Sequence, residues 1–167
     1  RKGRAMAIPV EIADFTSSKV VLIGRKTFHV GPLLVPGIAA AAAYAVNDQM
    51  GSVIAFTVPK EGTIVEVRFY DLDDEGLDKE LWLFRSSVVL AADNAAFSLT
   101  DAGIMEVEAV FLISTWRDAV NAQVGLTANT PASYRAPAGV LYGALKTLGT
   151  DNITAGSEPR ISLVVET

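Results

Sequence analysis

The stretch Ile64-Val65-Glu66-Val67-Arg68-Phe69-Tyr70 decides the fold class of this 167-residue chain. Apolar side chains alternate with charged ones along it, and Val65, Val67 and Phe69 fall on one face of an extended strand. Successive side chains of a strand point to opposite faces, so the pattern predicts a half-buried antiparallel strand that packs one face on a core. The starting interpretation is therefore an all-β protein.

Comparable apolar runs recur along the rest of the chain and favour strands over helices. They predict strands over residues 19–24, 40–46, 52–57, 81–84, 105–115, 123–127, 140–147 and 161–165. Turn residues separate these runs at 59–62, 71–78, 129–137 and 151–159. A helix of one or two turns is expected over residues 98–103, where Ser98 or Thr100 can cap its start. The sequence predicts an antiparallel β-sandwich, jelly-roll-like, of about eight strands.

The first part of the chain differs from the rest. It holds the only dense basic cluster, Arg1, Lys2 and Arg4, and three prolines by position 36. We interpret residues 1–38 as an extended N-terminal arm or anchoring segment and residues 39–167 as the sandwich domain. The basic cluster is either a solvated end or the part of the arm that docks on an acidic partner surface.

Composition excludes several classes of function. The chain has no Cys, so it can form neither disulfides nor thiolate metal sites. Its net charge of −5 makes it a poor candidate for nucleic-acid binding. The uncharged stretch 30–46 is interrupted by glycines and prolines and is too short to span a membrane. We expect no nucleic-acid partner and no membrane partner.

Catalytic signals are weak. His29 is the only histidine, and no nucleophile motif or phosphate-binding loop accompanies it. Glu106 and Glu108 lie on one face of a predicted strand, whereas glycoside cleavage needs two carboxylates that face each other across a cleft. We predict a protein that is not an enzyme, with no catalytic residues and no cofactor.

The acidic turn at 71–78 is the strongest local charge feature. Asp71, Asp73 and Glu75, followed by Gly76, resemble the opening of a calcium-binding loop, in which carboxylate oxygens surround a sharp turn. The twelfth position of such a loop needs a bidentate Glu and is Trp82 here. The three carboxylates are kept as metal candidates, and the alternative is a solvated hairpin tip.

Two aromatic residues are candidates for an interaction surface. Trp116 follows a predicted strand and precedes Arg117, and Tyr134 precedes Arg135. If they are exposed, they could form a platform for sugar rings. The alternative is that both supply buried area in the core, as aromatic residues usually do.

Several blocks together resemble a family of small structural proteins of tailed bacteriophages. Residues 44–51 match its Y-x-x-x-D-x-x-G opening, and a strand with Phe56 and an Asp-rich turn follow. Leu81-Trp82-Leu83-Phe84 matches L-x-L-F, and residues 93–102 match the D-N-A-A-F-x-x-x-D-A block. The blocks occur in the family's order, and the resemblance covers residues 44–167.

The resemblance implies a virion structural protein, on the capsid surface as a decoration, cement or head-fibre component, assembled in the host cytoplasm. Its partners would be the major capsid protein or other virion proteins, and it would form a homo-oligomer, with a trimer expected. The resemblance supplies no catalytic residues. The alternative function is a receptor- or carbohydrate-binding module of a phage fibre or tail.

Overall fold

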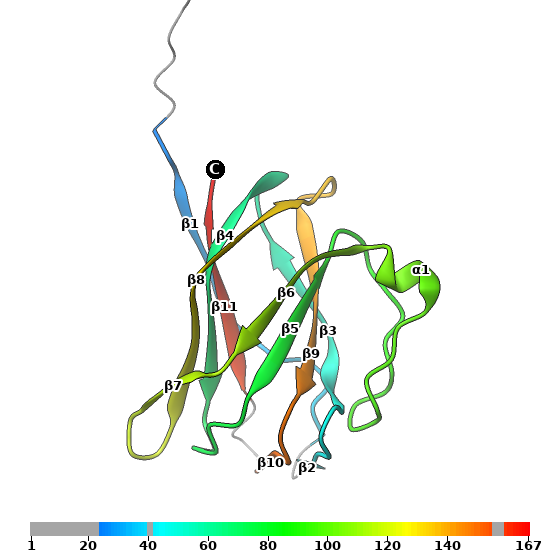
Figure 1. Ribbon diagram of the computed structural model, residues 1–167, viewed down its shortest axis with the longest axis vertical. Helices are drawn as coiled ribbons and strands as arrows, with labels where there is room; N and C mark the ends of the chain where they lie inside the picture. Colours follow the sequence, from blue (N-terminus) through cyan, green and yellow to red (C-terminus); the bar gives the residue numbers. More distant parts are fainter. Residues whose placement is uncertain (1–23, 40–41, 155–158) are drawn as a thin grey trace, which may run out of the picture.

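The computed structural model describes residues 24–39, 42–154 and 159–167. Within them the chain forms eleven strands and one short helix (Figure 1). The elements are β1 (Thr27–Leu34), β2 (Ala42–Ala43), β3 (Gln49–Thr57), β4 (Glu61–Asp71), β5 (Lys79–Phe84), α1 (Asp101–Ile104), β6 (Val107–Ile113), β7 (Thr115–Asp118), β8 (Gln123–Arg135), β9 (Val140–Thr147), β10 (Asn152–Ile153) and β11 (Arg160–Glu166). The predicted all-β class is confirmed.

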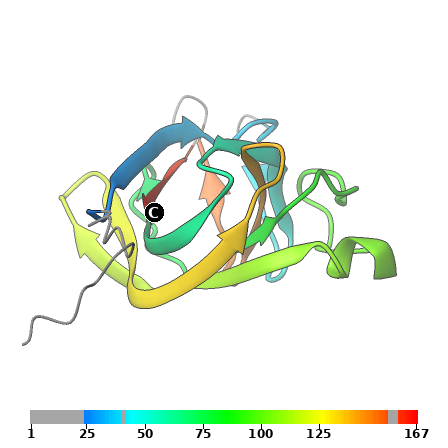
Figure 2. The ribbon, with the colours of Figure 1, turned by 90° about the horizontal axis from the view of Figure 1, so that it is seen from above.

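Two antiparallel sheets pack face to face (Figures 1 and 2). One has the order β1-β11-β4-β8-β7 and the other β3-β9-β5-β6, while β10 and β2 pair separately. Eight of the strands are six residues or longer. Along the chain the first of these eight pairs with the eighth, the second with the seventh, the third with the sixth and the fourth with the fifth. This is the winding of a jelly roll, as predicted.

β4 shows how the sequence builds the core and where its simplest interpretation fails. Ile64, Val67 and Phe69 point inward and are almost completely buried, whereas Val65 is only half-buried. The register between β4 and β8 shifts between Ile64 and Glu66. A β-bulge inserts one residue and reverses the alternation, so Val65 does not share the core face with Val67 as predicted.

The sheet begins earlier than the predicted boundary at residue 39. Thr27–Leu34 falls within the segment interpreted as the arm, yet it forms β1, which pairs with β11 along the sheet edge. It contains Pro32, and proline is tolerated in an edge strand because its missing N–H can face solvent. Residues 1–23, with most of the strand expected at 19–24, lie outside the described residues.

Other boundaries also differ from the sequence prediction. The prediction of a turn at 129–137 is wrong for residues 129–135, because β8 continues to Arg135 and pairs there with the start of β4. The single strand expected at 105–115 breaks at Ser114 into β6 and β7, which belong to different sheets. Residues 40–41 lie outside the described residues, and of the rest of the strand expected at 40–46 the two residues of β2 are extended and paired.

The expected helix is present. α1 starts after Thr100, whose hydroxyl accepts a hydrogen bond from the Gly103 amide at 3.1 Å. Of the two caps proposed from the sequence, the structure uses Thr100. No helix in the described residues is long and apolar enough to cross a membrane.

Candidate functional site

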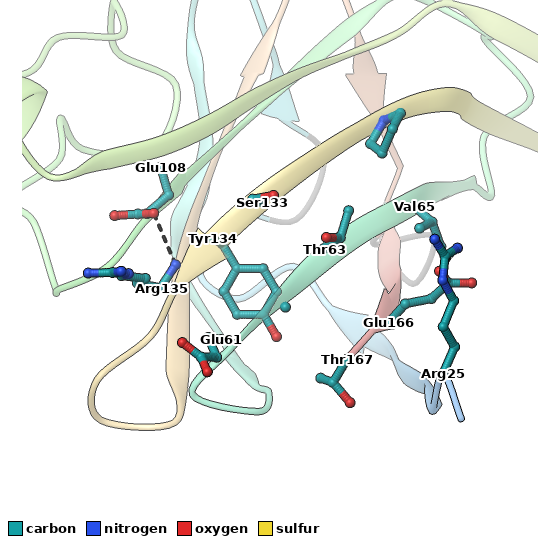
Figure 3. A pocket seen from close by; sticks show the side chains of 12 residues that line it. Arg25, Glu61, Thr63, Val65, Glu108, Ser133, Tyr134, Arg135, Glu166 and Thr167 are labelled. Carbon is teal, nitrogen blue, oxygen red and sulfur yellow. Dashed lines mark hydrogen bonds and ion pairs between the residues drawn. The ribbon is translucent and has the colours of Figure 1, made fainter. Parts of the chain in front are cut away.

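A groove of about 910 Å³ opens at the end of the molecule where β4 begins and β8 and β11 finish (Figure 3). The residues that line it come from segments far apart in the sequence: Arg25 before β1, the first residues of β4, Glu108 on β6, the last residues of β8, and Glu166. Gly62 lets β11 and the Tyr134 ring approach β4 closely in this groove. A Cβ at this position would lie 2.7 Å from the carbonyl oxygen of Glu166 and 3.1 Å from the Tyr134 hydroxyl oxygen.

The charged groups of the groove are mostly paired. The Arg25 guanidinium lies 3.0 Å from the Glu166 carboxylate. The Glu108 carboxylate accepts a hydrogen bond from the backbone amide of Arg135 at 3.0 Å and lies 3.8 Å from the Arg85 guanidinium. These exposed pairs contribute little to stability because water screens them. The groove offers polar and backbone groups for contact with another chain.

Tyr134 lies beside this groove but is not the exposed platform that we considered. Only 3% of its surface is exposed, and its hydroxyl donates a hydrogen bond to the carbonyl oxygen of Pro59 at 3.2 Å. Burial disfavours the charged phenolate and raises the pKa of Tyr134 to about 12. The ring therefore belongs to the core, with its hydroxyl fixing the turn between β3 and β4.

This burial predicts an alkaline loss of stability. The neutral phenol is favoured in the folded state, so its contribution is complete below the ordinary pKa of 10.0 and is lost as pH rises toward about 12. We expect Tyr134→Phe to lower the free energy of unfolding by about 1 kcal/mol at pH 7. Between pH 10 and 12 it should flatten the fall in stability, measured by urea unfolding with absorbance titration of phenolate.

Tyr142→Phe is the matched control, since the Tyr142 hydroxyl makes no hydrogen bond within the described residues and its ring is half-buried. If the Tyr134→Phe protein loses stability above pH 10 as steeply as the wild type, burial of the Tyr134 phenol is not the cause.

Trp116 is half-buried and packs against the edge of the core. Its ring packs edge-on against Phe69, with 6.1 Å between ring centroids, and its indole N–H donates to Asp78 at 3.3 Å. The ring covers Gly125, where a Cβ would lie 2.8 Å from a ring carbon. Of the two alternatives considered from the sequence, Tyr134 follows the buried one, whereas Trp116 is half-buried with part of its ring packed on the core.

The acidic turn uses its carboxylates to hold its own backbone. Asp71 is buried and accepts hydrogen bonds from the amides of Asp73, Glu75 and Gly76 at 2.8–3.0 Å. Asp73 accepts from Thr154, and Glu75 accepts from the Asn152 amide at 2.8 Å. The three metal candidates thus serve separate donors. No group of three or more His, Asp or Glu side chains suited to a metal ion occurs in the part of the chain that the structure describes.

Burial changes the ionisation of Glu75. Its pKa is raised, chiefly by burial and further by the nearby carboxylates of Asp151, Asp71 and Asp73, against a lowering by the Asn152 amide. The hydrogen bond from the Asn152 amide to Glu75 joins the acidic turn, which precedes β5, to β10.

The remaining sequence candidates have simple placements. Arg1, Lys2 and Arg4 lie outside the described residues. His29 is exposed on β1 opposite Val164, and no hydrogen bond joins its side chain to another described residue. Glu106 and Glu108 are both close to Arg85 and neutralise it rather than facing each other across a cleft.

The blocks that carry the phage resemblance meet in space. Asp93 accepts hydrogen bonds from the Tyr44 hydroxyl at 2.7 Å, the Gly51 amide at 2.6 Å and the Ala39 amide at 2.9 Å. Asp48 forms a β-bridge with Ala96. The Y-x-x-x-D-x-x-G and D-N-A-A-F blocks therefore form one latch, which fixes the long connection between β5 and α1 to the start of β3.

Sequence reasoning missed the groove. Its lining residues carry no motif, and only the pairing of β4 with β8 and of β1 with β11 brings them together. No protein-family model matches the chain, and no curated protein matches it.

Proposed function

We propose that this protein is a structural component of a tailed-phage virion, a decoration or cement protein that binds the major capsid protein and stabilises the shell. The observation that supports it best is the latch. Tyr44 and Gly51 of the first block donate to Asp93 of the later block, and Asp48 bridges to Ala96, which supports treating the two blocks as one structural motif.

The architecture is compatible with this proposal. Jelly rolls are common in viral capsid proteins, although the same fold also serves lectins and cupins, so the fold alone does not assign a function. The candidates for other chemistry within the described residues take part in packing: the acidic turn closes on its own amides, Tyr134 is buried, and the half-buried Trp116 packs against Phe69. The receptor-binding alternative depended on exposure of Trp116 and Tyr134, and it loses that support.

The proposal is tested with capsids that lack the protein. Purified full-length chain is mixed with these shells, and binding is measured by co-sedimentation and shell stability by thermal disassembly. We expect saturable binding and a higher disassembly temperature. The same measurement on the chain from residue 24 onward separates the contribution of the N-terminal segment. No binding by the full chain would refute the proposal, whereas equal binding by both chains would refute only a role for the segment.

A further inference from the structure

Of the four strands at the edges of the two larger sheets, β6 presents the longest regular and uncharged stretch to another chain. Exposed edges are usually blunted by proline, bulges, charge or short length. β1 contains Pro32, β3 carries a register shift, and β7 has four residues. β6 has its own register shift at Glu108, but Ala109–Ile113 beyond it pair regularly with β5 and carry no charge. The Glu108 carboxylate is already engaged by the Arg135 amide and by Arg85. One backbone edge of β6 has no strand partner within the described residues.

The outward face of β6 is apolar as well as unpaired. Val110 and Leu112 point away from the core, with 44% and 53% of their surfaces exposed. Val110 lies opposite Trp82 in the register of β5, and Trp82 borders a hollow of about 340 Å³ that Phe97 and Ile104 also line. An extended chain laid along β6 would cover this strip and gain backbone hydrogen bonds.

The sequence outside the described residues contains a segment suited to that position. Ile8, Val10 and Ile12 alternate with Pro9 and Glu11. In an added strand, the three apolar side chains share one face, and the backbone groups of the same three residues point to the same edge. Pro9 then lies with its missing N–H toward solvent, which is where proline is tolerated, and it blocks addition of a further strand.

From these observations we infer that residues 8–12 of one copy add as a strand to β6 of a second copy. β1 and β6 lie at opposite corners of the sandwich, since β1 contacts β3 and β6 contacts β8 (Figure 2). A chain's own segment would have to wrap around the molecule to reach its own β6. Eleven residues lie between Ile12 and Gly24, and the twelve Cα steps span about 40 Å when extended, enough to reach an adjacent copy. Strand addition of this kind takes its affinity from backbone hydrogen bonds and its specificity from alternate side chains.

The test uses full-length chains and their association state, measured by sedimentation velocity. We expect the wild type to sediment as an oligomer, and Leu112→Lys and Val10→Glu each to sediment as monomers. Val120→Lys is the matched control, because Val120 is equally apolar and 80% exposed but lies in the turn after β7. It should remain oligomeric. Circular dichroism confirms that each variant is folded.

Mixing the two monomeric variants gives the sharpest result. Leu112→Lys retains an intact segment and Val10→Glu retains an intact β6, so the mixture should form a complex that neither variant forms alone. A monomeric wild type, an oligomer unaffected by both changes, or a mixture that stays monomeric would each refute the inference. The outcome is independent of capsid binding. An oligomer that does not bind capsids would refute the proposed function alone. A monomer that binds capsids would refute only the strand addition.

Discussion

Replacing Lys79 with Met lowers the free energy of unfolding by about 3–5 kcal/mol, because it leaves a buried carboxylate without its partner. Lys79 is 1% exposed, and its ammonium lies 2.6 Å from the carboxylate of Asp151, which is 2% exposed. The same ammonium donates to the carbonyl oxygen of Leu77 at 2.6 Å and lies 5.5 Å from the ring centroids of Phe69 and Trp116. Without it, Asp151 retains the Thr147 hydroxyl as a side-chain donor.

The double variant Lys79→Met/Asp151→Leu distinguishes the cost of an orphaned charge from the value of the pair. Buried ion pairs often contribute little in total, because desolvation offsets their attraction. We expect the double variant to be more stable than Lys79→Met alone, by urea unfolding. Arg25→Met is the control for a solvent-exposed pair and should cost less than about 1 kcal/mol. If Lys79→Met and Arg25→Met cost the same, Lys79 is not neutralising a buried charge.

The sequence predicts best those elements whose structure is determined by residues close to one another in the chain. The patterns of apolar residues predicted β9 and β11, and the Thr100 hydroxyl, a capping group, predicted the start of α1. In each case the physical cause lies within a few residues, as a pleat with one covered face or an amide group that needs an acceptor. The number and spacing of such strands indicated a sandwich or jelly roll, while the pairing order that makes it a jelly roll came from the structure.

The errors arise where long-range pairing overrides local preference. Asn129 and Pro131 resemble turn residues, yet β8 passes through both because β4 offers a continuous partner. Gly31 and Pro32 likewise argued against a strand at β1, although an edge strand tolerates both residues. The bulge in β4 moved Val65 off the core face, and nothing in the alternation itself reveals an inserted residue.

The groove and the buried pair lie beyond sequence reasoning for a further reason. Lys79 and Asp151 are 72 positions apart in number, and the sequence places each beside a polar turn. Only the stacking of the two sheets turns Lys79 inward, under the ring of Trp116. The register between sheets cannot be read from a single sequence, so sites assembled across it are invisible until the fold is known.

Removing the Asp93 carboxylate releases the latch that carries the phage resemblance. Asp93→Ala leaves the buried Tyr44 hydroxyl and the amides of Gly51 and Ala39 without their acceptor. Hydrogen bonds to a charged acceptor contribute about 1.5–3 kcal/mol each, and orphaned donors add to the loss, so we expect Asp93→Ala to cost about 3–5 kcal/mol. Asp118→Ala is the control, because Asp118 accepts one amide hydrogen bond in an exposed turn, and it should cost less than about 1 kcal/mol.

The Tyr44 phenol reports on the latch directly. Burial and the hydrogen bond to Asp93 together raise the pKa of Tyr44 far above its ordinary value. The milder Asp93→Asn change keeps one acceptor oxygen and removes the negative charge, so the pKa of Tyr44 should fall while the fold persists. Absorbance titration of phenolate measures this shift. In a double-mutant cycle with Tyr44→Phe, the two changes should be strongly non-additive. Additive losses would mean that Asp93 stabilises the chain without acting through Tyr44, and the latch would then rest on its backbone donors alone.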